Sequence, residues 1–200
     1  MKKAIAFFMA IALMLPIGIP AASAANCDKT VTYKVSEEAM EQEFQAKIDE
    51  AIREKSAKEM TPYGNYDYTY TTEVADTRTT VVSGYPGNQP PGGTRFRKPG
   101  FFYWKDSGGP EVNASVTFSV PLKVVEFSVA LGIEVGDSSE VGRGLFIEDT
   151  THFWKLYIYK NMEVRHTKIW QTNRHTGEVK LYMETYVPVL ASYELDAKQV

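Results

Sequence analysis

One segment constrains the fold more than any other, because its side chains alternate in polarity. In VVEFSVALGIEV, residues 124–135, every second residue from Val125 is apolar, and Glu126, Ser128 and Glu134 stand among the residues between them. A period of two is typical of a β-strand with one apolar face. That face carries Val125, Phe127, Val129, Leu131, Ile133 and Val135. It meets either the core of a β-domain or, in a membrane-active protein, the lipid bilayer.

The run just before it alternates in the same way. Apolar residues from Ala114 to Val120 alternate with Ser115, Thr117 and Ser119, and Pro121 separates the two runs. The two runs form either a tight hairpin or one strand bent at the proline. Their alternation favours antiparallel pairing, because parallel strands buried on both faces read as continuous apolar runs.

Further strands are expected on both sides of this pair. Residues 66–82 interleave tyrosines with threonines and Asp67, which predicts a strand with two rather polar faces, exposed on one side or at a sheet edge. Residues 152–195 read as a long hairpin whose turn contains Gly177 at a position that favours positive φ. Pro188 suggests that this end of the hairpin lies at a sheet edge.

A single helix is expected over about residues 36–60. Ser36 is a good N-cap, and Glu37 and Glu38 lie in the first turn, where the helix dipole favours negative charge. The helix should end before Pro62. Its apolar stripe recurs at i+4 and consists of Met40, Phe44, Ile48 and Ile52. The stripe predicts a helix lying across a sheet, with a partner-binding surface helix as the alternative.

These elements predict a mainly β fold: one antiparallel β-sandwich-like domain, residues 25–200, with one N-terminal amphipathic helix. The preceding residues, 1–24, read as a signal peptide. Lys2 and Lys3 come before an apolar run, and residues 22–24 fit the small-x-small cleavage pattern. The apolar run is shorter than the ~20 residues that span a bilayer. We therefore predict a bacterial protein secreted through a Sec-type signal cleaved near Ala24.

Charge and cysteine content narrow the function classes. Without Lys2 and Lys3 the chain has 20 basic and 25 acidic side chains, a net charge near −5, which argues against nucleic-acid binding. Cys27 is the only cysteine, so no intrachain disulfide can form and the core alone must stabilise the fold.

No catalytic or metal-binding motif is present. The histidines are His152, His166 and His175, and neither GxSxG, HExxH nor SxxK occurs. Cys27 lies too near the mature N-terminus to favour a thiol dyad. We therefore expect no enzyme, no cofactor and no metal, with an unrecognised secreted hydrolase as the remaining catalytic alternative.

A loop rich in glycine and proline, residues 83–110, also carries six aromatic and four basic residues. A disordered linker would be poor in aromatics, so this loop either packs on one end of the core or binds a ligand. Exposed aromatics can stack on sugars, and arginines make cation–π contacts. The ligand-binding candidates are Arg95, Phe96, Arg97, Phe101, Tyr103 and Trp104.

Two functional hypotheses follow. The leading one is a non-enzymatic interaction protein that acts outside the cell or at its surface and binds cell-wall glycan or a surface protein through residues 95–105. The alternative is a membrane-active protein, a pore-forming toxin or bacteriocin-like factor, that oligomerises and inserts residues 113–135. Membrane strands need ~9–11 residues with one apolar and one polar face. The insertion candidates are Val125, Phe127, Val129, Leu131 and Ile133.

Overall fold

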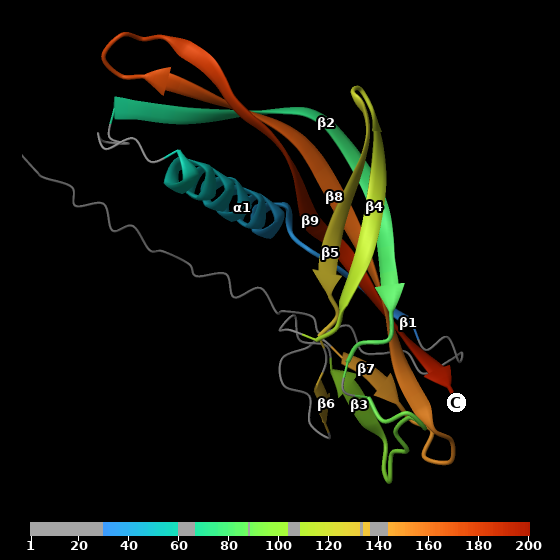
Figure 1. The fold of residues 1–200 in the computed structure, drawn as a ribbon. Helices are drawn as coiled ribbons and strands as arrows, with labels where there is room; N and C mark the ends of the chain where they lie inside the picture. Colours follow the sequence, from blue (N-terminus) through green and yellow to red (C-terminus); the bar gives the residue numbers. More distant parts are fainter. Residues whose placement is uncertain (1–29, 60–66, 88, 104–108, 133, 137–143) are drawn as a thin grey trace, which may run out of the picture.

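A long antiparallel sheet forms the body of the molecule (Figure 1). The computed structural model describes residues 30–59, 67–87, 89–103, 109–132, 134–136 and 144–200. The sheet has the order β1-β9-β8-β2, and each neighbouring pair is antiparallel. Its strands are β1 (Thr30–Lys34), β2 (Tyr68–Gly84), β8 (Trp154–Asn173) and β9 (Val179–Gln199). The sequence-based predictions for residues 1–24 and for Cys27, Trp104 and Ile133 lie outside the described residues.

The pairing of β9 with its neighbouring strands is irregular. Asn161 pairs with Ser192 but Met162 with Leu190, so one residue of β9 bulges there. β1 pairs only with the part of β9 from Ser192 to Asp196. At Pro188, β9 is therefore an outer strand, where the missing proline N–H removes no ladder hydrogen bond.

The helix α1 (Glu37–Lys58) covers one face of the sheet near the turn between β8 and β9. Ser36 caps it as its spacing suggests, with the Ser36 Oγ accepting from the Ala39 N–H at 3.2 Å. The helix buries Phe44 and Ile48 against the sheet. Their partners are Ile169, Tyr182, Val187 and Val189.

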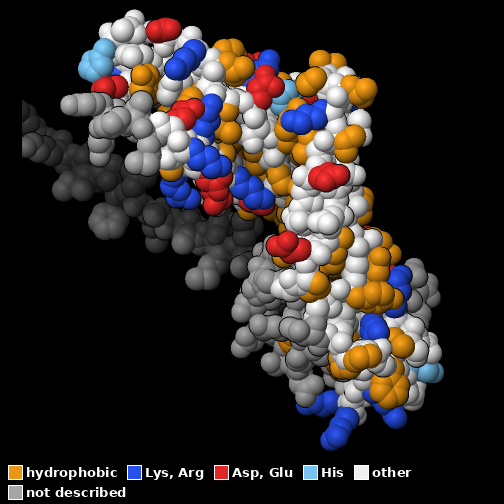
Figure 2. Space-filling view, viewed as in Figure 1, with side chains coloured by type: hydrophobic (Ala, Val, Ile, Leu, Met, Phe, Trp, Pro, Cys, Tyr) orange, Lys and Arg blue, Asp and Glu red, His pale blue; other side chains and the backbone are white. Residues whose placement is uncertain are grey.

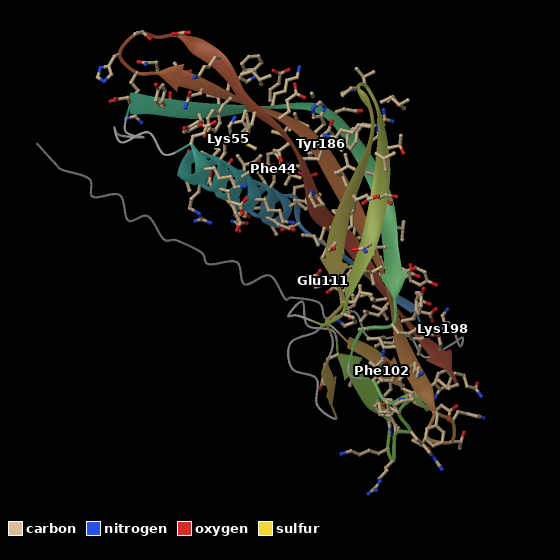
Figure 3. All side chains as sticks on the ribbon, in the orientation of Figure 1. Phe44, Lys55, Phe102, Glu111, Tyr186 and Lys198 are labelled. Atoms are coloured by element: carbon tan, nitrogen blue, oxygen red, sulfur yellow. The ribbon has the colours of Figure 1, made fainter. Side chains whose placement is uncertain are left out.

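A second core lies on the opposite face, towards the other end of β8 (Figure 3). It is covered by a small sheet of order β6-β3-β7, made of β3 (Gly100–Tyr103), β6 (Glu134–Gly136) and β7 (Gly144–Ile147). Phe102 and Ile147 pack here with Leu156 and Leu195, all of them fully buried. Part of the loop 83–110 thus fills this end of the core.

The two alternating runs form a hairpin of β4 (Glu111–Ser119) and β5 (Leu122–Ala130). The expectation of a single strand over 125–135 is wrong, because β5 ends at Ala130 and residues 134–136 belong to the small sheet. The chain leaves the hairpin at Leu131, whose N–H donates to the Pro110 carbonyl and whose own carbonyl accepts from Gly87.

The predicted fold class is confirmed: the chain is mainly β, its sheets are antiparallel and it has a single helix among the described residues. The arrangement is sandwich-like, because the small sheet and the β4–β5 hairpin both lie over one face of the long sheet.

Candidate functional site

The β4–β5 hairpin has one apolar and one polar face. The cross-strand pairs Val112–Val129, Ala114–Phe127 and Val116–Val125 share the inner face, which is turned towards the long sheet. The outer face is exposed and carries Asn113, Ser115, Thr117, Glu126 and Ser128. The Ser128 hydroxyl donates to the Asn113 Oδ1 across this face at 2.9 Å. Two strands that both alternate, paired in this register, thus make an amphipathic hairpin.

Within the described structure the hairpin strands pair only with each other. The hairpin lies along β2, which is one of the two edge strands of the long sheet. The side chains of β2 on that face include Asp76, Arg78 and Thr80, and Arg78 donates to the Ser119 hydroxyl at 3.1 Å. Val112, Ala114 and Phe127 of the apolar hairpin face pack against the second core, to which β2 contributes the buried Val82. Val116, Val125 and Phe127 stay partly exposed.

The base of the hairpin is its most firmly held part. Val129 and Leu131 belong to the second core. The buried Lys160 donates from its Nζ to the Ala130 carbonyl at 2.8 Å. A Cβ on Gly84 would lie 2.8 Å from the Leu131 side chain, so β2 approaches the base closely. Of the insertion candidates, Val129 and Leu131 therefore belong to the base, and Val125 and Phe127 to the hairpin face further from it.

Phe118 anchors the hairpin near its tip. It is fully buried, with its ring centroid 4.9 Å from Tyr186 and 6.0 Å from His166. Tyr186 and His166 stack at 4.7 Å, and Lys123 lies over the Tyr186 ring at 4.5 Å. Burial, and to a lesser degree the charge of Glu184, raises the pKa of the Tyr186 hydroxyl.

His166 lies beneath this aromatic anchor. Its Nε2 is 3.1 Å from a Glu184 carboxylate oxygen, and its Nδ1 is buried with no hydrogen-bond partner in the described structure. The hairpin is thus anchored here on a site that is itself polar.

The hairpin tip is apolar and open to solvent. Val120, Leu122 and Val124 are 77%, 84% and 60% exposed. The tip lies at the end of the hairpin far from the small sheet (Figure 1). An apolar cluster of this kind on a surface marks a site of interaction with protein or membrane.

The ligand-binding candidates of the loop separate into two groups. Arg95 and Arg97 are exposed, whereas Phe96 between them is buried, with its ring 5.1 Å from Phe102. Phe101 and Tyr103 are half-buried, and Phe101 packs on the exposed Phe146 at 4.7 Å. The structure therefore presents the arginines to solvent and uses Phe96 as a core residue.

The histidines do not gather in one cleft. His152 and Asp149 form an exposed pair at 2.6 Å, and His175 and Asp67 another at 2.9 Å. Hydrogen bonds from Thr151 and then His152 hold the pKa of Asp149 far below its ordinary value of 3.8. In the part of the chain that the structure describes, no three His, Cys, Asp or Glu side chains are placed to hold a metal ion.

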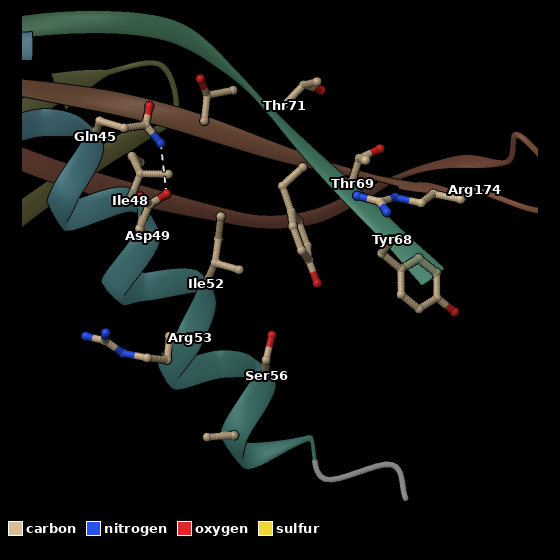
Figure 4. A pocket seen from close by; sticks show the side chains of 13 residues that line it. Gln45, Ile48, Asp49, Ile52, Arg53, Ser56, Tyr68, Thr69, Thr71 and Arg174 are labelled. Atoms are coloured by element: carbon tan, nitrogen blue, oxygen red, sulfur yellow. Dashed lines mark hydrogen bonds between the residues drawn. The ribbon is translucent and has the colours of Figure 1, made fainter. Parts of the chain in front are cut away.

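A large groove lies elsewhere, between α1 and the first residues of β2 (Figure 4). It encloses about 970 Å³ and is lined by apolar helix residues, by Tyr68 and Tyr70, and by Arg53 and Arg174. This groove is not among the sites predicted from the sequence. Its only signal in the sequence is the polar, tyrosine-rich strand facing an amphipathic helix.

Comparison of the chain with family models, curated proteins and solved structures finds no match. None of the described helices has the length and apolar character needed to cross a membrane. The function is therefore inferred from the geometry of the hairpin and the loop.

Proposed function

We propose that this is an exported, non-enzymatic protein that acts on membranes by releasing and inserting its β4–β5 hairpin. One observation carries the proposal: an amphipathic hairpin pairs with no other described strand and ends in an apolar tip that is exposed to solvent.

The dimensions of the hairpin fit a bilayer. Each strand has nine residues, or about 30 Å at the rise of an extended chain. In a membrane the face with Val116, Val125 and Phe127 meets lipid, and the face with Thr117 and Glu126 points away from it. Several copies must associate, because every backbone N–H and C=O in the hydrocarbon needs a partner.

A second candidate function is the interaction module that the sequence favours. The exposed Arg95 and Arg97 support a contact at that end of the molecule, while the burial of Phe96 removes one of its aromatic contacts. Both hypotheses describe a non-enzymatic protein acting outside the cell, and they differ in the element that acts.

Two substitutions at adjacent residues test the insertion. Val116→Asp places a charge on the apolar face, and Thr117→Asp places the same charge at nearly the same depth on the polar face. We expect protein expressed from the full sequence to release dye from liposomes. We expect Val116→Asp to reduce that release at least roughly tenfold, and Thr117→Asp to leave it within about twofold, since charge on a lipid-facing position is costly.

Equal effects of the two substitutions, or no release by the wild type, would contradict the proposal. Because Val116 is half-buried, a second measurement avoids loss of folding. In Cys27→Ser protein, single cysteines at Val125 and at Ser128 carry an environment-sensitive dye. Insertion shifts the emission of the dye at 125 to the blue and leaves the dye at 128 nearly unchanged.

A further inference from the structure

We propose that Arg95, Arg97 and Lys98 form a contact site for the phosphate groups of an anionic phospholipid surface. We name these three residues the basic tip. The inference rests on the proposed function and deepens it, since it names the surface on which the hairpin acts.

The basic tip is held on a rigid base. Arg95 and Arg97 point outward because Phe96 between them is buried in the core against Phe102. The backbone of Thr94 exchanges two hydrogen bonds with Trp154, at 2.8 and 2.9 Å. The Arg95 Nε donates to the Thr150 carbonyl at 3.0 Å. Because Arg95 and the backbone that carries all three residues are already positioned, the site loses less entropy on binding than a free loop would.

The cations of the basic tip are available to an external anion. Although the protein as a whole is acidic, no carboxylate of the described residues forms an ion pair with any of the three. The nearby Asp149 carboxylate is occupied by Thr151 and His152. In Figure 2, blue side chains gather at the lower end of the molecule, with no red ones beside them.

Two exposed aromatic rings lie on the chain segments that pair with the loop of the basic tip and with β3. Phe153 is exposed. It directly precedes Trp154, whose backbone pairs with Thr94. Phe146 is exposed on the outer face of the small sheet beside Phe101. Aromatic and basic residues together are typical of surfaces that lie at the headgroup level of a bilayer. Arginine also binds phosphate through two parallel hydrogen bonds.

A planar membrane fits this charge distribution better than a long soluble polyanion. A polyanion that wrapped the molecule would meet its acidic surface, whereas a plane touches only the end that carries the basic tip. Beyond about 8–10 Å at physiological salt, the remaining acidic side chains are screened from the plane. The base of the hairpin lies beside the small sheet (Figure 1), so a hairpin turning about its base can extend towards the same membrane.

Vesicle flotation tests the assignment with protein expressed from the full sequence. The probes are vesicles of phosphatidylcholine alone and vesicles that also contain phosphatidylglycerol. The test variant replaces Arg95, Arg97 and Lys98 with glutamine. The matched control replaces three exposed cations of the opposite end, Lys58, Arg174 and Lys180, with glutamine.

We expect binding to the phosphatidylglycerol vesicles only, and weaker binding as salt rises. The basic-tip variant should bind these vesicles at least roughly tenfold more weakly than the wild type, since each basic residue at such a surface strengthens binding several-fold. The binding of the control variant should stay within about threefold of the wild type. Equal loss in both variants, or equal binding to both kinds of vesicle, would overturn the assignment. So would soluble polyphosphate that binds the wild type as tightly as the vesicles do, which would identify a free phosphate polymer as the ligand.

The outcomes separate this inference from the proposed function. Flotation that depends on Arg95, Arg97 and Lys98 but comes without dye release would support the basic tip as a lipid-binding site and refute hairpin insertion. If the basic-tip variant retains full dye release from both kinds of vesicle, insertion is supported and the assignment of the basic tip as a lipid-binding site is refuted. Val116→Asp should float like the wild type and release little dye.

Discussion

At the scale of single residues, Gly100 leaves the room that the buried ring of Phe96 needs beneath the basic tip. A Cβ at Gly100 would lie 2.8 Å from the ring of Phe96, the buried residue that orients Arg95 and Arg97. Within the same loop, a Cβ at Gly92 would meet nothing within 4 Å. The two glycines therefore make a matched pair for substitution.

We expect Gly100→Ala to lower the free energy of unfolding by about 1–3 kcal/mol, because the added methyl group overpacks the core at Phe96. Gly92→Ala should change it by less than about 1 kcal/mol. Urea denaturation monitored by tryptophan fluorescence measures both. Similar values for the two variants would show that Phe96 moves aside easily and does not fix the loop.

Asp149 provides a pH dependence whose sign can be stated. Its pKa lies below the ordinary 3.8, so its ionised form stabilises the folded state at pH values above 3.8, and this contribution is lost as pH falls further. We expect Asp149→Asn to be less stable than the wild type at pH 7, with a smaller difference at pH 3. Urea midpoints at the two pH values test this. A difference that grows at pH 3 would have the wrong sign.

At the scale of elements, the β4–β5 hairpin should open independently of the long sheet, because Phe118 is its one buried anchor outside the base. We expect Phe118→Ala to cost the docked hairpin about 2–3 kcal/mol. This cost lies below the usual value for a core phenylalanine. The reason is that water can enter the space left by the ring and solvate the polar His166. Hydrogen exchange should quicken in residues 111–130 and stay slow in β8.

The control for this measurement is Val124→Ala, an exposed residue of the same hairpin. It should leave the exchange of residues 111–130 nearly unchanged. Faster exchange throughout β8 in Phe118→Ala would show instead that hairpin and sheet open as one unit.

The local sequence pattern predicts the helix and the strands well, but it predicts poorly which elements pack or pair with one another. Alternation identified both arms of the hairpin, and the cap and stripe identified α1, because these signals reside in side chains close together in sequence. The alternation of 125–135 continues through Leu131, yet long-range bonds to Pro110 and Gly87 divide it between two sheets. Likewise, only the packing of Phe96 on Phe102 separates the buried ring from the exposed arginines.

At the scale of the whole molecule, β8 and β9 connect two cores that lie on opposite faces of one sheet. Antiparallel class and a single helix were predictable from composition and period. The division into two cores was not, because alternating strands assign residues to faces without saying what covers each face. For the same reason, the alternation of the hairpin strands does not predict that Val112, Ala114 and Phe127 pack against the second core.

The chain enters and leaves the hairpin at one point, where the Leu131 N–H meets the Pro110 carbonyl at 2.9 Å. In genetic terms, the codons between these two residues form a cassette. The protein segment that it encodes begins and ends at neighbouring points of the fold. Lengthening, shortening or exchanging that cassette alters what projects from the molecule and leaves the framework strands in register. Diversity among descendants of such a gene would then accumulate most easily inside the cassette.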